Sequence, residues 1–224
     1  MTTTRRRQWL VPAGLVALSL VPVAAGAARL TQLAGGTSVT SDNARFFTAP
    51  APVIIHIVGA TVFCLLGAFQ FVPTLRSGRS HWHRLSGRVL VPFGLAAAIS
   101  GLWMAVFYDL PASDNAVLEL LRLVFGSLMV MSLVLGVVAI ARRQVDRHRA
   151  WMMRGYAIGL GAGTQVLTVL PWVIIVGTPT PAVRAGLMGA GWIINLAVAE
   201  YFIRTSPIVE SAKRPTRLSV SSVR

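Results

Sequence analysis

The sequence has little charge, few acidic residues and a single cysteine. Charged residues make up 12% of the 224 residues, about half of the roughly 25% found in soluble domains, which excludes an ordinary soluble domain. The one cysteine, Cys64, excludes an intrachain disulfide and a thiolate metal site, and its apolar neighbours indicate a small packing residue. Nucleophile constellations, phosphate-binding loops and paired catalytic carboxylates are also missing, so the sequence indicates no class of enzyme.

Apolar residues are abundant instead, at 54% of the chain, and they gather in long segments. Segments of about 20 apolar residues are long enough to cross a bilayer as helices. The two-residue alternation of membrane β-strands is absent. The sequence therefore predicts an all-α polytopic transmembrane bundle of about six spans, at residues 9–28, 52–75, 89–108, 116–141, 151–176 and 185–203.

The basic residues mark one side of this predicted bundle. Lys and Arg number 21 against 7 Asp and Glu, a net charge of +14, and they lie between and beside the apolar segments rather than on one polar domain. This distribution argues against nucleic-acid binding and follows the positive-inside rule. The N-terminus, the loops at 76–88 and 142–150 and the tail are expected in the cytoplasm, where they would attract anionic lipid headgroups.

The chain divides into three predicted parts. Residues 1–8 form a basic cytoplasmic N-terminus, residues 9–203 the six-helix membrane domain, and residues 204–224 a basic tail that we expect to be disordered. The first span is expected to be retained, although the small residues at 23–28 leave a cleaved secretory signal as the alternative. Residues 30–49, polar and rich in Gly, Ser and Thr, are expected to form an external loop.

Polar residues inside a membrane are costly, so each one is a candidate site. A group of them is predicted to meet at the cytoplasmic boundary, with Glu200 paired to Arg154 or Arg88. A set of helix-anchoring salt bridges is the alternative to a headgroup, quinone or cofactor pocket. The candidate ligand-binding residues are Arg84, Arg88, Arg154, Asn195 and Glu200, and the candidate cofactor-binding residues are His83, His148 and His56.

The histidines raise the hypothesis of haem b, which needs axial ligands on facing helices. His83 and His148 both lie at inner span ends and are the predicted pair, whereas His56 lies near the outer face without a second histidine at its depth. A metal site of His81 and His83 with His148 is a weaker alternative, because no acidic or thiolate ligand lies near them. Solvated interfacial histidines are the simplest alternative.

Two further patterns predict packing. Glu119 and Arg122 lie three residues apart on one helix and are expected to form a local ion pair at the outer interface. Gly155, Gly159 and Gly163 repeat every four residues, which places them on one face and predicts close approach of another helix.

Several of these residues recur as a set in a known family. The chain resembles the uncharacterised bacterial membrane proteins grouped as domain of unknown function 2306, over about residues 50–203. The resemblance implies a multi-pass protein of a bacterial cell (inner) membrane, and it implies no activity. The matching residues are His56, Gly67, Gln70 and Phe71; Arg76, His83, Arg84, Gly87 and Arg88; His148, Trp151, Met152 and Arg154; and Trp192, Asn195, Ala199 and Glu200.

Three functions remain open from the sequence. The first is a redox protein that binds haem b or quinone near His83 and His148 for electron transfer. The second is a transporter or lipid-handling protein, which the apparent lack of a broken helix weakens. The third is a non-catalytic membrane subunit or scaffold, with a homo-oligomer or a membrane partner subunit as its possible assemblies.

Overall fold

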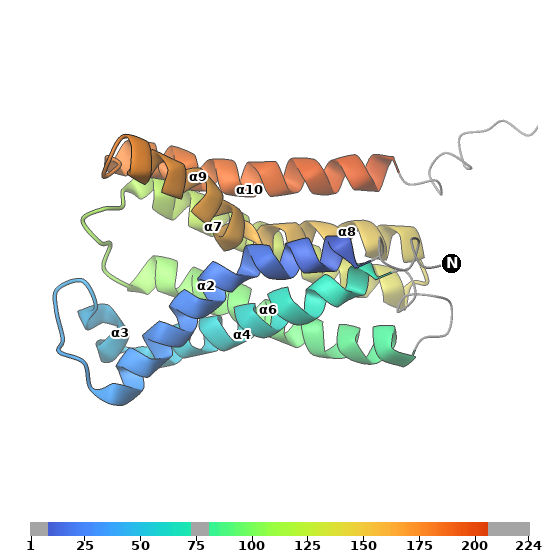
Figure 1. The fold of residues 1–224 in the computed structure, drawn as a ribbon. Helices are drawn as coiled ribbons and strands as arrows, with labels where there is room; N and C mark the ends of the chain where they lie inside the picture. The colour runs from blue at the N-terminus through green and yellow to red at the C-terminus, as the bar shows by residue number, and fades with distance from the viewer. Residues whose placement is uncertain (1–8, 73–80, 206–224) are drawn as a thin grey trace, which may run out of the picture.

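The computed structural model describes residues 9–72 and 81–205, and every regular element within these ranges is helical. The long helices run roughly side by side along one axis (Figure 1). The two ends of the described chain lie at the same end of the bundle, here called the termini end. The opposite end carries the short helix α3 and is called the α3 end. Arg76, the rest of the segment 73–80, residues 1–8 and the tail from 206 lie outside the described residues.

Five helices are long and apolar enough to cross a membrane on their own. Helices α8 and α9, which are bent by 41° relative to each other, pass the same test together and bring the number of candidate crossings to six. The prediction of about six spans is therefore confirmed. The bounds are α2 (Leu10–Gly35), α3 (Ala44–Thr48), α4 (Pro50–Ala68) with the 3-10 turn η1 (Phe69–Phe71), α6 (His81–Phe107), α7 (Ala116–Ala141), α8 (Val145–Gly159), α9 (Gly161–Ile175) and α10 (Pro181–Arg204).

Helix ends follow local capping chemistry where the sequence supplies it. Asn115 caps α7, because its side chain accepts a hydrogen bond from the backbone N–H of Leu118 at 3.0 Å. Thr180 caps α10 in the same way through the N–H of Val183. Pro181 follows at the first position of α10, where its missing N–H costs nothing. These two caps place α7 at its predicted bounds and begin α10 four residues before the predicted start.

Three predicted boundaries are wrong. The third span begins at His81 rather than 89, so His83, Arg84 and Arg88 lie on a helix and not in a loop. The external loop predicted at 30–49 is partly helical, because α2 continues to Gly35 and α3 occupies Ala44–Thr48. The basic loop at 142–150 shortens because α8 begins at Val145. Helices α2, α6 and α8 extend beyond their apolar parts into polar stretches, and α3 is a separate short helix. The polar composition of these stretches had indicated loops.

The core lies between α4, α6, α7 and the α8–α9 pair. Phe63, Leu133 and Met129 are buried there, and the buried ring of Tyr156 packs against Phe63. Glycines allow the helices to approach: a Cβ at Gly94 would lie 2.7 Å from the ring of Phe63. Many large apolar side chains on the outer faces are exposed, as expected for helices that face lipid.

Candidate functional site

The crossing made of α8 and α9 is interrupted at Leu160. The N–H of Gly163 donates to the carbonyl of Leu160 at 3.0 Å, whereas a continuous α-helix would direct it to Gly159. The carbonyl of Gly159 instead accepts a hydrogen bond from the thiol of Cys64 on α4, at 3.5 Å. Non-helical backbone at membrane depth is tolerated where protein surrounds it or where it lines a cavity. The break predicted to be absent is therefore present, and α4 satisfies one of its carbonyls.

Helix α10 satisfies a second carbonyl near the break. Asn195 donates from Nδ2 to the carbonyl of Ala157 at 3.0 Å, and its Oδ1 accepts from the hydroxyl of Thr164 at 2.7 Å. One amide thus contacts α8 and α9 on the two sides of the bend. Asn195 was predicted as a ligand-binding residue, and the structure places it in the support of the broken helix.

The seam between α9 and α10 continues this polar contact. Gln165 donates to the carbonyl of Met188 at 3.1 Å, and Thr168 donates to that of Leu187 at 2.8 Å. At the bend itself, Trp192 lies so close to Gly161 that a Cβ there would be 2.2 Å from the indole Nε1. These contacts fix α9 on α10 rather than in line with α8.

The predicted glycine seam has more than one partner. Gly155 faces Leu133 of α7 and Gly163 faces Leu18 of α2, while Gly159 packs against the ring of Phe63. The close approach was predicted correctly, but it involves several helices, because the break at Leu160 turns Gly163 away from the face of the other two glycines.

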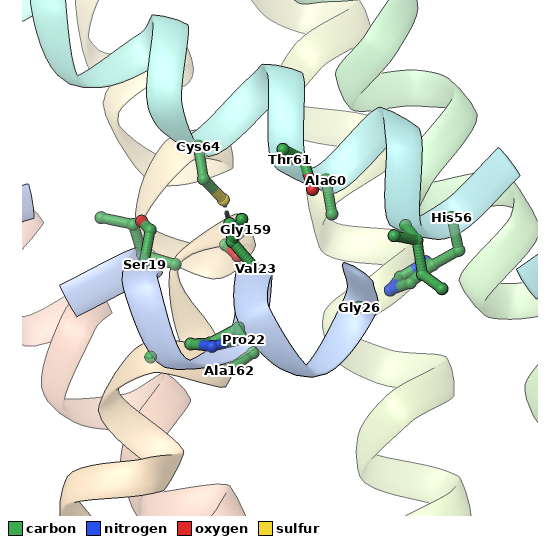
Figure 2. Close-up of a pocket in the computed structure, with 13 residues that line it drawn as sticks. Ser19, Pro22, Val23, Gly26, His56, Ala60, Thr61, Cys64, Gly159 and Ala162 are labelled. Carbon is green, nitrogen blue, oxygen red and sulfur yellow. Dashed lines mark hydrogen bonds between the residues drawn. The ribbon is translucent and has the colours of Figure 1, made fainter. Parts of the chain in front are cut away.

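A partly open cavity of about 190 Å³ lies beside this break, between α2, α4 and the start of α9. It extends along α4 from His56 to Cys64 (Figure 2), which is about 12 Å along a helix. The wall is formed mostly by small and apolar side chains. The lining residues are Ser19, Pro22, Val23, Gly26, His56, Ile57, Ala60, Thr61, Cys64, Gly159, Leu160, Ala162 and Gly163.

His56 is the one titratable side chain with a basic nitrogen in this wall, and its orientation is fixed. Its Nδ1 lies 2.8 Å from the carbonyl oxygen of Ala97 on α6. A carbonyl only accepts, so Nδ1 carries the proton and donates. The ring also lies over Gly101, where a Cβ would be 3.2 Å from its Cε1. In the neutral imidazole the other nitrogen, Nε2, is therefore an acceptor, and the ring extends from α4 toward Gly26 of α2 (Figure 2).

At the termini end, the predicted partners Arg154 and Glu200 do meet. The Nε of Arg154 lies 2.5 Å from Oε1 of Glu200, and a second contact of 3.2 Å makes the pair bidentate. The guanidinium also lies 4.8 Å from the ring centroid of Trp151. Arg204 approaches Glu200 at 3.6 Å. Helix α10 is thereby joined to α8.

The other predicted residues at this end lie apart from that pair. Arg84 and Arg88 are exposed on α6, which packs mainly against α4 and α7. His148 is half-buried on α8 and its Nδ1 donates to the carbonyl of Gly136 on α7 at 2.8 Å. His83 lies half-buried in the first turn of α6. A cofactor role for His83 and His148 stays a prediction.

The α3 end holds an ion cluster that the sequence did not suggest. Arg122 pairs with Asp114 at 2.6 Å, and Arg184 of α10 pairs with the same carboxylate at 2.9 Å. The local pair predicted between Glu119 and Arg122 is replaced by this non-local one. Burial alone would raise the pKa of Asp114, but hydrogen bonds and charge from the two arginines outweigh it and hold the pKa below its ordinary value.

Cys64, Ser19 and Asp114 were not predicted as site residues. Asp114 lies in a short turn between two apolar segments, and no local sequence pattern indicates that its carboxylate is buried. Cys64 and Ser19 are small residues of apolar helices. Only the packing of these helices beside the break places them in the cavity wall. Within residues 9–72 and 81–205, no three His, Cys, Asp or Glu side chains are grouped closely enough to hold a metal ion.

Comparison with known proteins places the chain in one family. The family described as "Predicted membrane protein (DUF2306)" matches residues 53–203, which run from the first turn of α4 to the last turn of α10. No curated protein and no solved structure matches the chain. The match includes His56, Cys64, the break at Leu160 and the Arg154–Glu200 pair. The chain therefore belongs to the DUF2306 family of predicted membrane proteins.

Proposed function

We propose that this protein binds, within the membrane, a small apolar molecule that carries a hydroxyl group, such as a quinol headgroup. The observation that carries the proposal is the hydrogen bond from His56 Nδ1 to the carbonyl of Ala97, which leaves Nε2 as an acceptor in the cavity wall. A charged imidazole at this depth would be costly, so the neutral form is favoured. An acceptor selects a ligand that donates a hydrogen bond.

The cavity size and lining support the same class of ligand. Ligand pockets that enclose a whole drug-sized molecule measure roughly 300–1,000 Å³. A cavity of about 190 Å³ suits a single ring or headgroup whose tail leaves through the open side into lipid. Its wall is mainly apolar, with the hydroxyl of Ser19 committed to the carbonyl of Leu15 at 2.9 Å. Quinol binding is the form of the electron-transfer hypothesis that this cavity supports.

The haem hypothesis concerns a different place, His83 and His148 at the termini end. The hydrogen bond from His148 Nδ1 to Gly136 leaves its Nε2 for a ligand, as in many metal-bound histidines. An absorbance spectrum of the purified protein tests this hypothesis. A Soret band that disappears in His148→Phe would support it, and no band after haem supplementation would reject it.

A transporter or lipid-handling role is the second candidate, and the break at Leu160 favours it. Broken helices line the substrate sites of many transporters, and here the break forms part of the cavity wall. Vesicles that contain the protein should then move a fluorescent hydroxyl-bearing lipid between leaflets. Ala60→Phe would fill the cavity and should abolish this movement. Equal rates in both proteins would reject the transport role.

We further place the protein in a bacterial inner membrane with both ends in the cytoplasm. The support is the distribution of arginine: within the described residues, eight of twelve lie at the termini end. Reporter fusions after residue 224 and within the loop at 109–115 test the orientation. Cytoplasmic signal from the tail and external signal from the loop are expected, and the reverse pattern would overturn the assignment.

Co-purification tests the binding proposal. The protein is purified in mild detergent, extracted with organic solvent, and the apolar extract is analysed by mass spectrometry. A hydroxyl-bearing molecule should be retained by the wild type and reduced about tenfold in His56→Phe, because a hydrogen bond in an apolar site is lost. Val58→Phe, on an exposed face of α4, is the matched control and should retain it. Equal extracts from all three proteins would reject the proposal.

A further inference from the structure

The α3 end carries four arginines within the described residues, which is unexpected for an end predicted to be external. Arg122 and Arg184 are accounted for, because both pair with the buried carboxylate of Asp114. The other two, Arg29 on α2 and Arg45 on α3, have no such partner. Within residues 9–72 and 81–205 neither forms an ion pair, although Asp42 lies three residues before Arg45 in the chain.

Arg29 and Arg45 converge on one aromatic ring. Their guanidinium carbons lie 4.5 Å and 4.7 Å from the ring centroid of Phe46. Arg29 also donates to Gln32 at 2.8 Å, and Arg45 reaches the backbone carbonyl of Asp109. These contacts hold the two cations in place but use only part of the five N–H donors that each guanidinium carries.

The ring that receives them is itself fixed at the end of the bundle. Phe46 packs edge-on against Tyr108, with centroids 5.5 Å apart. The hydroxyl of Tyr108 donates to the carbonyl of Ala49 at 2.5 Å and so joins the end of α6 to the chain between α3 and α4. Helix α3 lies beside the ends of the spanning helices (Figure 1). Helices that cross a bilayer end near the headgroup region, so we expect α3 to lie there.

Both guanidiniums are half-buried at the same ring, and within the described residues neither has a carboxylate partner. A partly buried charge without a counter-ion is costly, so an anion from outside the protein is favoured there. We infer that Arg29 and Arg45 bind the phosphate of a phospholipid headgroup at the α3 end. The phosphodiester is the anion present at this depth, and guanidinium groups match its oxygens in a bidentate manner. The acyl chains would then lie along the exposed apolar faces of α2 and α4. This site is separate from the His56 cavity and does not depend on it.

Native mass spectrometry of the detergent-solubilised protein with added phosphatidylglycerol tests the inference. The wild type should retain one phospholipid more than Arg29→Gln/Arg45→Gln does. The apparent affinity of the wild type for phosphatidylglycerol should be at least about fivefold higher than that of the double variant. The matched control, Arg142→Gln/Arg147→Gln, removes the same charge from exposed positions at the other end and should retain that lipid. Diacylglycerol, which lacks the phosphate, should not occupy the site.

Three results with the wild type and the glutamine variant would overturn the inference. They are equal lipid retention by the double variant, equal binding of diacylglycerol, and displacement of the lipid by low millimolar inorganic phosphate, which would indicate a site for a free anion. Arg29→Lys/Arg45→Lys separates binding from folding, because it keeps both charges. It should retain more lipid than the glutamine variant at the same thermal stability, and equal loss in both would count against a charge-based site.

Discussion

Asn195 of α10 donates a hydrogen bond to the carbonyl of Ala157, in the last turn of α8, and accepts one from Thr164 of α9. A single amide therefore connects three helices at the point where the α8–α9 crossing bends. The bend in turn exposes the carbonyl of Gly159 to Cys64 and forms one wall of the His56 cavity. The stability of the bend and the shape of the cavity are thus linked through a few named contacts.

Asn195→Ala removes both hydrogen bonds of this amide. We expect a loss of about 1 kcal/mol in the free energy of unfolding, because polar contacts between membrane helices contribute modestly. Ile194→Ala, at a neighbouring position that is 46% exposed, is the control and should cost less. Unfolding in mixed detergent micelles measures both, and equal losses would contradict the role of Asn195.

Gly161→Ala tests the contact at the bend itself. The new Cβ would lie 2.2 Å from Nε1 of Trp192, whose ring is stacked on Phe125 with centroids 4.8 Å apart and has little room to move. We expect a destabilisation of about 1–3 kcal/mol. Gly186→Ala, with no heavy atom within 4 Å of its Cβ position, should be neutral or stabilising by about 0.5–1 kcal/mol. Similar melting temperatures for the two variants would contradict the packing described.

The sequence predicts some parts of this region and not others. Helix α7 was predicted at its true bounds, because its apolar run is continuous and polar segments flank it on both sides. The break at Leu160 was missed because the residues on both sides are apolar, so hydropathy does not change there. The cavity was missed because its wall comes from helices distant in the chain, and no local pattern reports their convergence.

The charged residues show the same division. Arg154 and Glu200 were predicted to pair because a carboxylate at that depth needs a cation, and the pair is present. The pairing of Arg122 with Glu119 was wrong, because spacing along one helix was the only criterion. Asp114 is more buried and receives two arginines, a geometry that depends on how α10 packs beside α7.

The Arg154–Glu200 pair should contribute only a modest amount of stability. Its side chains are 27% and 30% exposed, so solvent screens the interaction. A double-mutant cycle with Arg154→Gln and Glu200→Gln should give a coupling energy of about 0.5–1 kcal/mol. Arg204→Gln is the control, because Arg204 is 80% exposed and lies farther from Glu200, at 3.6 Å. A coupling near zero would contradict a pair fixed by two hydrogen bonds.

The Asp114 cluster predicts a dependence of stability on pH. The pKa of Asp114 in the folded protein lies below the unfolded value of about 3.9, so its contribution is fully present above that pH. The contribution is lost as the pH falls through the folded pKa, where the carboxylate takes up a proton. The melting temperature of the wild type should therefore decrease when the pH is lowered below about 4.

Asp114→Asn is the variant for this test, with exposed Asp146→Asn as the control. At pH 7 the Asp114 variant should be less stable by roughly 2 kcal/mol, because two arginines lose their partner. The difference from the wild type should shrink as the pH falls below about 4. A difference that stays constant from pH 7 to pH 3 would show that the charge of Asp114 does not stabilise the fold.

The account rests most directly on His56 as an acceptor in the cavity. The decisive measurement compares the affinities of a quinol and of its quinone for the purified protein, in the wild type and in His56→Phe. The wild type should bind the quinol about tenfold more tightly, since only the quinol donates a hydrogen bond to Nε2. This preference should disappear in His56→Phe. Equal affinities of the wild type for both molecules, or the same preference in the variant, would contradict the account.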